Sequence, residues 1–534
     1  MLRESGTARE ILSIQKELEH QRSTWTEHWQ DVAQFVLQRQ DDFYGTRKPG
    51  EKRTERVYDS VAPMAAEKCA TLIESVATPR DMRWHGLQPM DKELRGDRSI
   101  QQTFEEATDL LFMRRYSGGG NFATQWAETL LSMVCFGTGV MLVEDAPGRG
   151  LSYKSTHLGE HYLMENPWGE IDTDYRKFRM RGHQAIRFYN DAPSELLQKW
   201  EKGKNEWFWF VHCVKPNPDY VPGAFGDRQK YLSQHVSEDH AVLLRTGGYR
   251  TFPYVIVRYV TAPNEVYGRG PAMIALPEIK MLNRMRRSDL RARNLAVAPP
   301  ILTANESSVR RVNLKENAIN FGALDANGNQ LIVPWQSGAR IDLSNDSIQQ
   351  SHQIINDGFL IRLFQILVET PQMTATEVME RRQDKASLLA PTMGRIQSEG
   401  LSRLIERELD ILAVRGELPE HPRLENFAYE VEYTSPISRM LKAENALSVQ
   451  RTVDAVVPIA QIDPSVLDAF NWDEYAKIIA EANNAPARLF FSEEEMEAKR
   501  KAQQEQQMMQ MASQMAPEFA GAAKDLAQAQ SYGR

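Results

Sequence analysis

Apolar side chains recur at helical intervals through the first part of the chain. Thr7 and Glu10 have the spacing of a capping box, which predicts a helix start. The apolar residues that follow are Ile11, Ile14, Leu18, Trp25, Trp29, Val32 and Val36. Their spacing predicts one amphipathic helix of about 30 residues. Further helices are predicted over 59–77, 91–115 and 122–136.

The pattern changes between residues 139 and 260. Short β-prone pieces alternate there with turns, and one helix is predicted at 194–202. The predicted strands are 139–144, 160–164, 206–214, 229–236 and 254–260. Together with the preceding helices, this mixture predicts an α+β fold.

Two long helices are predicted after this mixed region. The first covers 271–297 and ends before Pro299-Pro300. β-type pieces and turns follow, including Asn327-Gly328 and 333–335. The second helix begins near Ser344, and Thr370-Pro371 breaks it. Its apolar stripe consists of Ile348, Ile355, Phe359, Leu363 and Ile366.

A third long helix is predicted beyond this break. Thr374 and Glu377 form another capping-box pattern, and the helix runs to about Arg415. Pro391 should kink it, and Gly416 can end it. A strand at 429–433 and a largely helical segment follow, and the Ala-, Gln- and Gly-rich residues 516–534 are expected to be mobile.

Composition narrows the class of protein. The chain has 534 residues and a net charge of −8, which argues against a protein that coats DNA nonspecifically, because such binding needs many contacts from Lys and Arg to phosphate. Cys69, Cys135 and Cys213 lie far apart, so no disulfide framework or cysteine zinc site is expected, and a reducing cytosol is the natural setting. No apolar run reaches the roughly 20 residues that span a bilayer.

The first long helix carries a local excess of positive charge. Between Lys280 and Arg293 it has six cations and one acid, Asp289. Arg284, Arg287 and Arg291 fall on one helical face. This face fits either a position close to phosphates or ion pairs between neighbouring subunits.

Motifs for catalysis are weak. His157, Glu160 and His161 match the pattern of an inverted zinc peptidase, but their flanks resemble strands, on which residues four apart lie roughly 13 Å apart. The interpretation preferred here is two surface or interface histidines. Gly137-Thr-Gly139 and 147–150 are not followed by GK[ST], so they predict turns rather than phosphate loops. Because the chain lacks the GK[ST] phosphate loop of ATP-driven motors, any motor that acts on DNA with it would be another protein.

Four motifs resemble those of the portal, or head-to-tail connector, proteins of short-tailed bacteriophages. The first is Arg56-Val-Tyr-Asp-Ser-Val-Ala-Pro63, followed by Thr78-Pro79 and Arg83-Trp84. The second is Gly137-Thr-Gly-Val-Met-Leu142. The third is Tyr267-Gly-Arg-Gly-Pro271, followed by Leu276. The fourth is Met373-Thr-Ala-Thr-Glu-Val378, followed by Leu389-Ala-Pro391 and Gly394-Arg395.

This resemblance implies a portal fold. Its parts would be a wing at 1–268, a first stem helix at 269–300, a clip at 301–343, a second stem helix at 344–369, a tunnel loop at 370–376, a kinked wing helix and strand at 377–435, a helical crown at 436–515 and a mobile tail at 516–534.

The resemblance also implies a function without catalytic residues, cofactor or metal. A homododecamer at one capsid vertex of the virion, assembled in the host cytoplasm, would pass double-stranded DNA during packaging and ejection. Its implied partners are the terminase large subunit, tail adaptor and tail proteins, major capsid and scaffolding proteins and internal core proteins, with no membrane. A zinc peptidase, or a monomeric phage enzyme with an unrecognised site, is the alternative.

Individual residues take expected positions in such a ring. The channel residues would include Lys280, Arg284, Arg287 and Arg291. The tunnel loop would present Thr370, Pro371, Gln372 and Met373 to the bore. Phe321 and Trp335 would be either docking anchors of the clip or part of its core.

Overall fold

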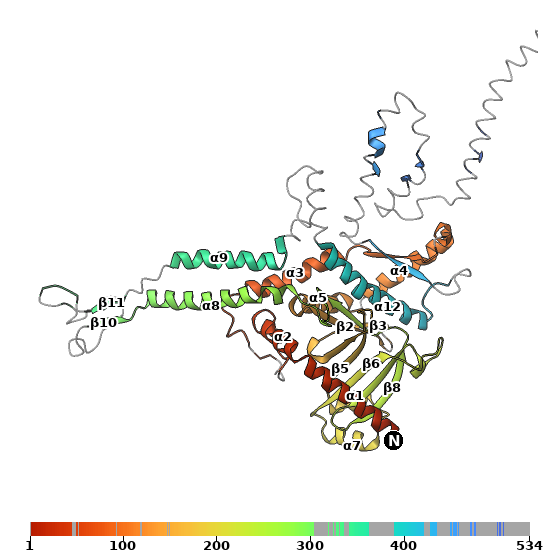
Figure 1. The fold of residues 1–534 in the computed structure, drawn as a ribbon, viewed down its shortest axis with the longest axis horizontal. Coiled ribbons are helices and arrows are strands. Elements are labelled where there is room, and N and C mark those ends of the chain that lie inside the picture. The colour runs from red at the N-terminus through yellow and green to blue at the C-terminus, as the bar shows by residue number, and fades with distance from the viewer. Residues whose placement is uncertain are drawn as a thin grey trace, which may run out of the picture. The chain divides into compact units, whose positions relative to one another are not determined.

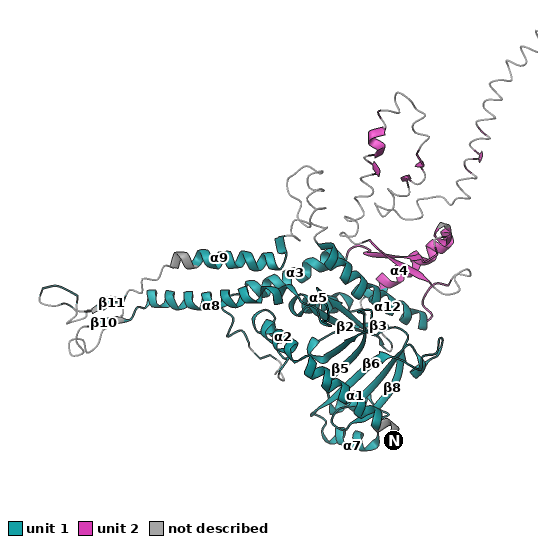
Figure 2. Cartoon of the chain, in the orientation of Figure 1, with its two compact units in different colours: residues 1–80, 114–415 teal, residues 81–113, 416–534 magenta. Residues whose placement is uncertain are grey.

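A computed structural model shows how the chain folds (Figure 1). It describes residues 2–44, 50–51, 53–91, 93–117, 120–146, 148, 150–303, 341–362, 389–420 and 428–434, with short pieces or single positions within 319–335 and 449–506. These residues form two compact units (Figure 2): residues 1–80 with 114–415, called unit 1, and residues 81–113 with 416–534, called unit 2. The segment 81–113 therefore groups with the C-terminal part and not with the rest of the wing proposed at 1–268.

Two antiparallel sheets form the β part of unit 1. The five-stranded sheet has the order β4 (His161–Glu165), β5 (Ile171–Arg181), β6 (Trp207–Pro216), β7 (Tyr231–Ser237) and β8 (Val242–Tyr249). The three-stranded sheet has the order β3 (Gly150–Thr156), β2 (Thr138–Ala146) and β9 (Tyr254–Arg258). The five predicted strands of this region are confirmed within two residues at each end, and β3, β5 and β8 are additions to that set.

Helices cover both faces of the five-stranded sheet. Helix α1 (Leu2–Gln21) buries Ala8 and Ile11 against one face, where Tyr175 and Val211 point. On the other face, α6 (Gly182–Phe188) and α7 (Ser194–Lys202) pack against Phe210 around Trp200. Because neighbouring residues of a strand point to opposite faces, both sides of this sheet contribute to the core.

The N-terminal helix differs from its prediction. Instead of one helix from Thr7, the chain forms α1 from Leu2 and then α2 (Ser23–Phe35), with Arg22 between them. Thr7 and Glu10 lie inside α1, so they do not form its cap. The buried Arg22 guanidinium donates to the carbonyl oxygens of His161 (2.6 Å) and Gly159 (3.0 Å). These long-range contacts stabilise the break, and local periodicity does not reveal them.

A helical layer lies beside the three-stranded sheet. Helix α5 (Phe122–Phe136) follows its predicted bounds and packs on β2 and β3, while α3 (Val61–Ala77) packs on α5. Cys69 of α3, Cys135 of α5 and Cys213 of β6 are all buried and free. Burial raises the pKa of the Cys69 thiol to about 12, so this thiol is unreactive at neutral pH.

Two long helices project side by side from this layer (Figure 1). Helix α8 (Pro271–Val297) has its predicted bounds. Helix α9 (Ile341–Gly358) returns along it and buries Ile348, Ile355 and Phe359. Between them, β10 (Ile301–Thr303) pairs with β11 (Ile332–Pro334). The predicted stripe is thus confirmed for its first three members, and Leu363 and Ile366 lie outside the described residues.

The second long helix is interrupted before its predicted end. Helix α9 stops at Gly358, and Leu360 has a positive φ of 55°, a left-handed conformation that an α-helix cannot continue through. Residues 361–362 are helical again, so the predicted break at Thr370-Pro371 stays a prediction. Thr370-Pro371, Thr374 and Glu377 lie outside the described residues.

The third long helix is distorted near its middle. Residues 389–395 are helical, a π-helix covers Ile396–Leu401, and α12 covers Ser402–Val414. The distortion seen here therefore lies after Pro391, whereas the prediction placed a kink at Pro391 itself. Gly416 has a φ of +67°, which agrees with its predicted role after the helix end.

Unit 2 contains a two-stranded sheet formed by distant segments. Strand β1 (His85–Pro89) pairs antiparallel with β12 (Tyr429–Tyr433), the strand predicted at 429–433. Helix α4 (Arg98–Tyr116) begins later than predicted, because Glu93–Gly96 forms a 3-10 turn before it. Most of the segments assigned to the crown and tail, 436–534, lie outside the described residues.

Candidate nucleic-acid interface

The root of α8 is a close contact between glycine backbones. Gly137 ends α5 with a φ of +79°, and a Cβ atom on it would lie 2.1 Å from the carbonyl oxygen of Gly268. A Cβ atom on Gly268 would lie 2.3 Å from the carbonyl oxygen of Gly137, and one on Gly270 would lie 2.5 Å from that of Val134. Two motifs that are 130 residues apart in the sequence therefore form one joint, and only glycine fits at its centre.

Hydrogen bonds lock this joint in place. The Gly268 N–H donates to Thr138 Oγ1 (2.9 Å), and the Tyr259 N–H donates to the Gly137 carbonyl oxygen (2.9 Å). The Tyr267 hydroxyl accepts from the Leu163 N–H and donates to the His161 carbonyl oxygen, both at 3.1 Å. The joint thus connects α8 to both sheets of unit 1 and fixes the direction in which the helix leaves.

Three cations of α8 form ion pairs within the subunit. Lys280 Nζ lies 2.7 Å from Asp31 of α2, Arg286 Nε lies 3.0 Å from Asp59, and Arg293 Nε lies 2.7 Å from Asp289. Lys280 thus pairs with Asp31 inside this chain through partly exposed side chains, and its position in a channel stays a prediction. Lys280 and Arg286 thus tie α8 to neighbouring segments, whereas Arg293 pairs within α8 and also donates to Asn345 Oδ1 of α9 (2.7 Å).

Asp59 lies where both long helices meet the segment before α3. Its carboxylate accepts from Arg286 of α8 and lies 2.9 Å from His352 Nε2 of α9. Burial alone would raise the pKa of Asp59, but the Val61 N–H, His352 and Arg286 together hold that pKa below its ordinary value. Asp59 therefore stays ionised and ties the two helices together at neutral pH.

The same segment touches α8 through its backbone and an aromatic ring. The Tyr58 N–H donates to Asn283 Oδ1 (2.7 Å), and Asn283 Nδ2 donates to the Arg56 carbonyl oxygen (2.8 Å). The Arg287 guanidinium lies 5.8 Å from the centroid of the Tyr58 ring. The motif 56–63 is thus a clamp on α8, a role that could not be assigned from its spacing alone.

Arg284, Arg287 and Arg291 are exposed on α8, on the side away from its buried positions. Within the part of the chain that the structure describes, Arg284 and Arg291 have no ion-pair partner, and Arg287 only borders the Tyr58 ring. The predicted shared face is therefore present as a row of accessible guanidinium groups. Such groups bind phosphate or carboxylate, both of which accept paired hydrogen bonds.

The histidine motif packs into unit 1, where its side chains pair with neighbouring residues. His161 is fully buried on β4, with Nδ1 at 2.8 Å from Asp174 and Nε2 at 2.8 Å from Thr156 Oγ1. Glu160 pairs with Arg176 at 2.8 Å, and His157 lies 3.0 Å from Asp42. The expectation of a surface His161 was wrong, because its two nitrogens stabilise the strand connection. Among the described residues, no group of three His, Cys, Asp or Glu side chains is placed to hold a metal ion.

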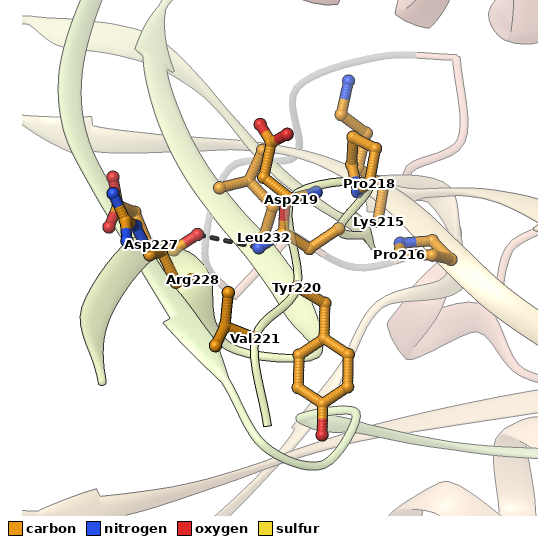
Figure 3. A pocket seen from close by; sticks show the side chains of 10 residues that line it. Lys215, Pro216, Pro218, Asp219, Tyr220, Val221, Asp227, Arg228 and Leu232 are labelled. Carbon is orange, nitrogen blue, oxygen red and sulfur yellow. Dashed lines mark hydrogen bonds between the residues drawn. The ribbon is translucent and has the colours of Figure 1, made fainter. Parts of the chain in front are cut away.

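A surface hollow of about 790 Å³ lies where β6 turns toward β7 (Figure 3). Its lining residues are Lys215, Pro216, Asn217, Pro218, Asp219, Tyr220, Val221, Asp227, Arg228 and Leu232. Asn217 Nδ2 donates to the carbonyl oxygens of Asp227 and Gln229, both at 2.8 Å. Asn217 thus holds the loop together, and the mixed charges of the lining do not converge on a ligand position.

Of the remaining predicted site residues, the structure describes one. Trp335 follows β11, donates its N–H to the Pro300 carbonyl oxygen (2.8 Å) and is 40% exposed in the single chain. Phe321, Thr370, Pro371, Gln372 and Met373 lie outside the described residues. In the described part of the chain, no helix has the length and apolar character needed to cross a membrane.

Comparison with known proteins assigns the chain to a family. Its sequence is 25% identical over 541 residues to the portal protein of Salmonella phage epsilon15, which covers 98% of this chain and 95% of that protein. It is 26% identical over 483 residues to the probable portal protein of Bordetella phage BPP-1, covering 88% and 86%. A solved structure titled "Neck of empty GTA particle computed with C6 symmetry" aligns with a TM-score of 0.38 and 11% identity over 76% of this chain and 92% of that chain. The family model described as bacteriophage head to tail connecting protein matches residues 8–490, and the chain therefore belongs to that family.

Proposed function

We propose that this protein forms a dodecameric ring at one vertex of a phage capsid, through which double-stranded DNA is packaged and later ejected. Family membership over residues 8–490 carries this proposal. The projecting pair α8 and α9 supplies the part that would line the channel. The row Arg284, Arg287 and Arg291 supplies accessible positive charge on an otherwise acidic protein.

The dimensions of α8 fit a channel wall. With 27 residues, α8 is about 40 Å long at about 1.5 Å per residue. Twelve helices at roughly 10 Å spacing form a ring with an axis-to-axis diameter of about 38 Å. Subtracting one helix width of about 10 Å leaves an opening of about 28 Å, which is wider than a DNA duplex of about 20 Å.

Weak contacts suit a channel through which DNA must move. A few arginines that meet phosphates across water are screened over a Debye length of about 8 Å at physiological salt. Each contact then breaks easily as the next one forms. A continuous basic lining would hold the DNA more tightly, and the net charge of −8 argues against one.

Charge reversal distinguishes a channel face from a subunit interface. The variant Arg284→Glu/Arg291→Glu should assemble rings, seen by negative-stain microscopy, but package or retain less DNA in phage assembled with it. The matched control is Arg187→Glu/Lys199→Glu, which reverses two exposed charges on α6 and α7, away from the projecting pair. If the Arg284/Arg291 variant fails to form rings, these arginines pair between subunits. If rings form and DNA packaging and retention match the control, the channel role is refuted.

The remaining roles belong to the same proposal. The segment around β10 and β11 would dock the terminase large subunit and later the tail adaptor, with Trp335 as an exposed anchor. The loop 370–376 would narrow the bore. Deleting 371–373 should reduce packaging or the retention of full-length DNA, and normal values for both would count against this role. Capsid, scaffolding and internal core proteins would contact the rest of the ring.

A further inference from the structure

Strand β5 has an unpaired edge along its C-terminal half. It pairs with β6 through Arg181, which lies opposite Trp207. On its other side, β4 starts at His161 opposite Arg176, so no strand of the described residues pairs with 177–181 there. Such an edge presents N–H and C=O groups to which another extended chain can bind.

The direction of the free backbone groups follows from two hydrogen bonds. The Gly182 N–H donates to the carbonyl oxygen of Glu206, on the β6 side (3.1 Å). The Arg181 N–H instead donates to Gln184 Oε1 (3.1 Å), away from the β6 ladder. Because alternate residues of an antiparallel strand direct their backbone groups to the same neighbour, Lys177 and Arg179 share the outward direction of Arg181. The backbone N–H and C=O of Arg179 therefore point to the free edge.

One face of this edge carries cations on an aromatic platform. Lys177, Arg179 and Arg181 alternate along β5 at about 7 Å spacing. The Arg179 and Arg181 guanidinium groups lie 4.7 and 5.2 Å from the Trp207 ring centroid. Lys177 pairs with Glu238 at 2.8 Å, whereas Arg179 and Arg181 have no carboxylate partner among the described residues. Stacking on Trp207, itself 48% exposed, holds the two arginines without using their hydrogen-bond donors.

The opposite face of the same edge is apolar. Phe178 and Met180 are partly buried and pack against the cluster around Trp200. A strand added beside 177–181 would place every second side chain next to the cations and the intervening ones next to Phe178 and Met180. The edge therefore favours a partner strand in which acidic side chains alternate with apolar ones.

We propose that this edge binds an extended segment of another polypeptide in which acidic and apolar residues alternate, added antiparallel as a further strand beside β5. Acidic side chains would pair with Arg179 and Arg181, and the backbone of the segment would bond to that of Arg179. The observations favour a peptide over a nucleic acid, because phosphates would satisfy the arginines but neither the strand edge nor the apolar face. This inference does not depend on the channel function.

A set of labelled peptides tests the proposal on the full-length protein by fluorescence anisotropy. The reference peptide alternates glutamate with valine over nine residues, and a second one has the same composition in shuffled order. In the proposed register, the glutamate N–H groups face β5, because the residue opposite Arg179 forms a hydrogen-bonded pair with it and alternate residues share that direction. N-methylation of the glutamates should therefore abolish binding, whereas N-methylation of the valines should leave it intact. Methylated peptides leave the protein unchanged, so misfolding cannot explain their results.

Variants of the protein test the side chains. Arg179→Glu/Arg181→Glu should weaken binding of the alternating peptide by roughly 2- to 25-fold, since each of the two lost cross-strand charge pairs contributes a factor of roughly 1.4 to 5. Arg228→Glu/Lys230→Glu reverses two exposed charges just before β7, at the opposite end of the sheet, and as the matched control it should bind as the wild type does. Equal affinity for the shuffled peptide, or for an oligothymidylate of nine nucleotides, would overturn the proposal. Absence of binding to every peptide would also overturn the proposal, and this outcome includes the case in which a second copy of the chain covers the edge.

Discussion

A buried ion pair allows a quantitative test of how unit 1 is held together. Arg115 of α4 faces Glu408 of α12, with Arg115 Nε at 2.8 Å from both carboxylate oxygens, and both side chains are fully buried. The Tyr153 hydroxyl of β3 donates to Glu408 Oε1 at 2.6 Å. Three elements distant in sequence therefore converge on one carboxylate.

Replacing Glu408 by glutamine should destabilise unit 1 strongly. The substitution leaves a buried guanidinium group without its counter-charge, which costs about 3–5 kcal/mol. Tyr153→Phe removes one hydrogen bond to a charged group and should cost about 1.5–3 kcal/mol. The double variant Arg115→Met/Glu408→Leu removes both charges, so its cost should be well below that of Glu408→Gln.

Urea unfolding followed by tryptophan emission can rank these variants. Trp126 is a suitable reporter, because its ring stacks on Phe122, which in turn contacts Tyr153 at a centroid distance of 5.2 Å. Midpoints should fall in the order wild type, Tyr153→Phe, Glu408→Gln, with the double variant above Glu408→Gln. A Glu408→Gln midpoint equal to that of the wild type, or a double variant as unstable as Glu408→Gln, would refute the desolvation argument.

Three further predictions concern the joint, acid stability and the clamp. Gly137→Ala should lower the unfolding free energy by about 3 kcal/mol or more, since its Cβ would lie 2.1 Å from a backbone oxygen. The control Gly169→Ala also has a positive φ but lies in open space, so it should lower the unfolding free energy by only about 1–2 kcal/mol. Equal urea midpoints for the two variants would contradict this. The pKa of His235 falls from 6.5 to about 3, mainly because of burial and also because of the nearby Arg245 and Arg176. Its neutral form stabilises the fold fully above pH 6.5, and this contribution is lost as the pH falls toward 3, by about 1.4 kcal/mol per pH unit. His235→Gln should flatten this dependence in urea midpoints measured at pH 7 and 5, and an unchanged slope would argue against it. Asp59→Asn should increase proteolysis of α8 and α9 in the folded protein, and an unchanged cleavage pattern would exclude the clamp.

Strong periodicity explains which elements could be predicted. The bounds of α5, α7 and α8 were predicted to the residue, because each has clear apolar spacing and a Gly or Pro signal at one end. Strand β5 was missed because its sequence, Ile-Asp-Thr-Asp-Tyr-Arg-Lys-Phe-Arg-Met-Arg, does not alternate regularly between apolar and polar residues. Helices cover both faces of its sheet, so residues on both faces of the strand are buried. Tertiary packing decided that strand, and its local sequence did not.

The candidate site was predictable in its charge but not in its pairing. The spacing of Arg284, Arg287 and Arg291 placed them on one face, since helix geometry alone determines this. That Lys280 would meet Asp31, 249 residues away, depends on how α2 packs on α8. No local signal marks such a partner, so the sequence could not separate free cations from those that hold the helix.

The π-helix at Ile396–Leu401 has a consequence for everything that precedes it in the third long helix. A π-turn holds one residue more than an α-helical turn, and each residue of an α-helix advances by about 100° around the axis. Removing a single residue there would restore regular winding and leave the side chains of 389–395 at nearly the same angle relative to α12, because the π-turn already takes up the extra residue within one turn. A single-residue deletion should therefore be tolerated within Ile396–Leu401, whereas the same deletion within the regular winding of α12 would rotate residues 389–401 by about 100° relative to the end of that helix.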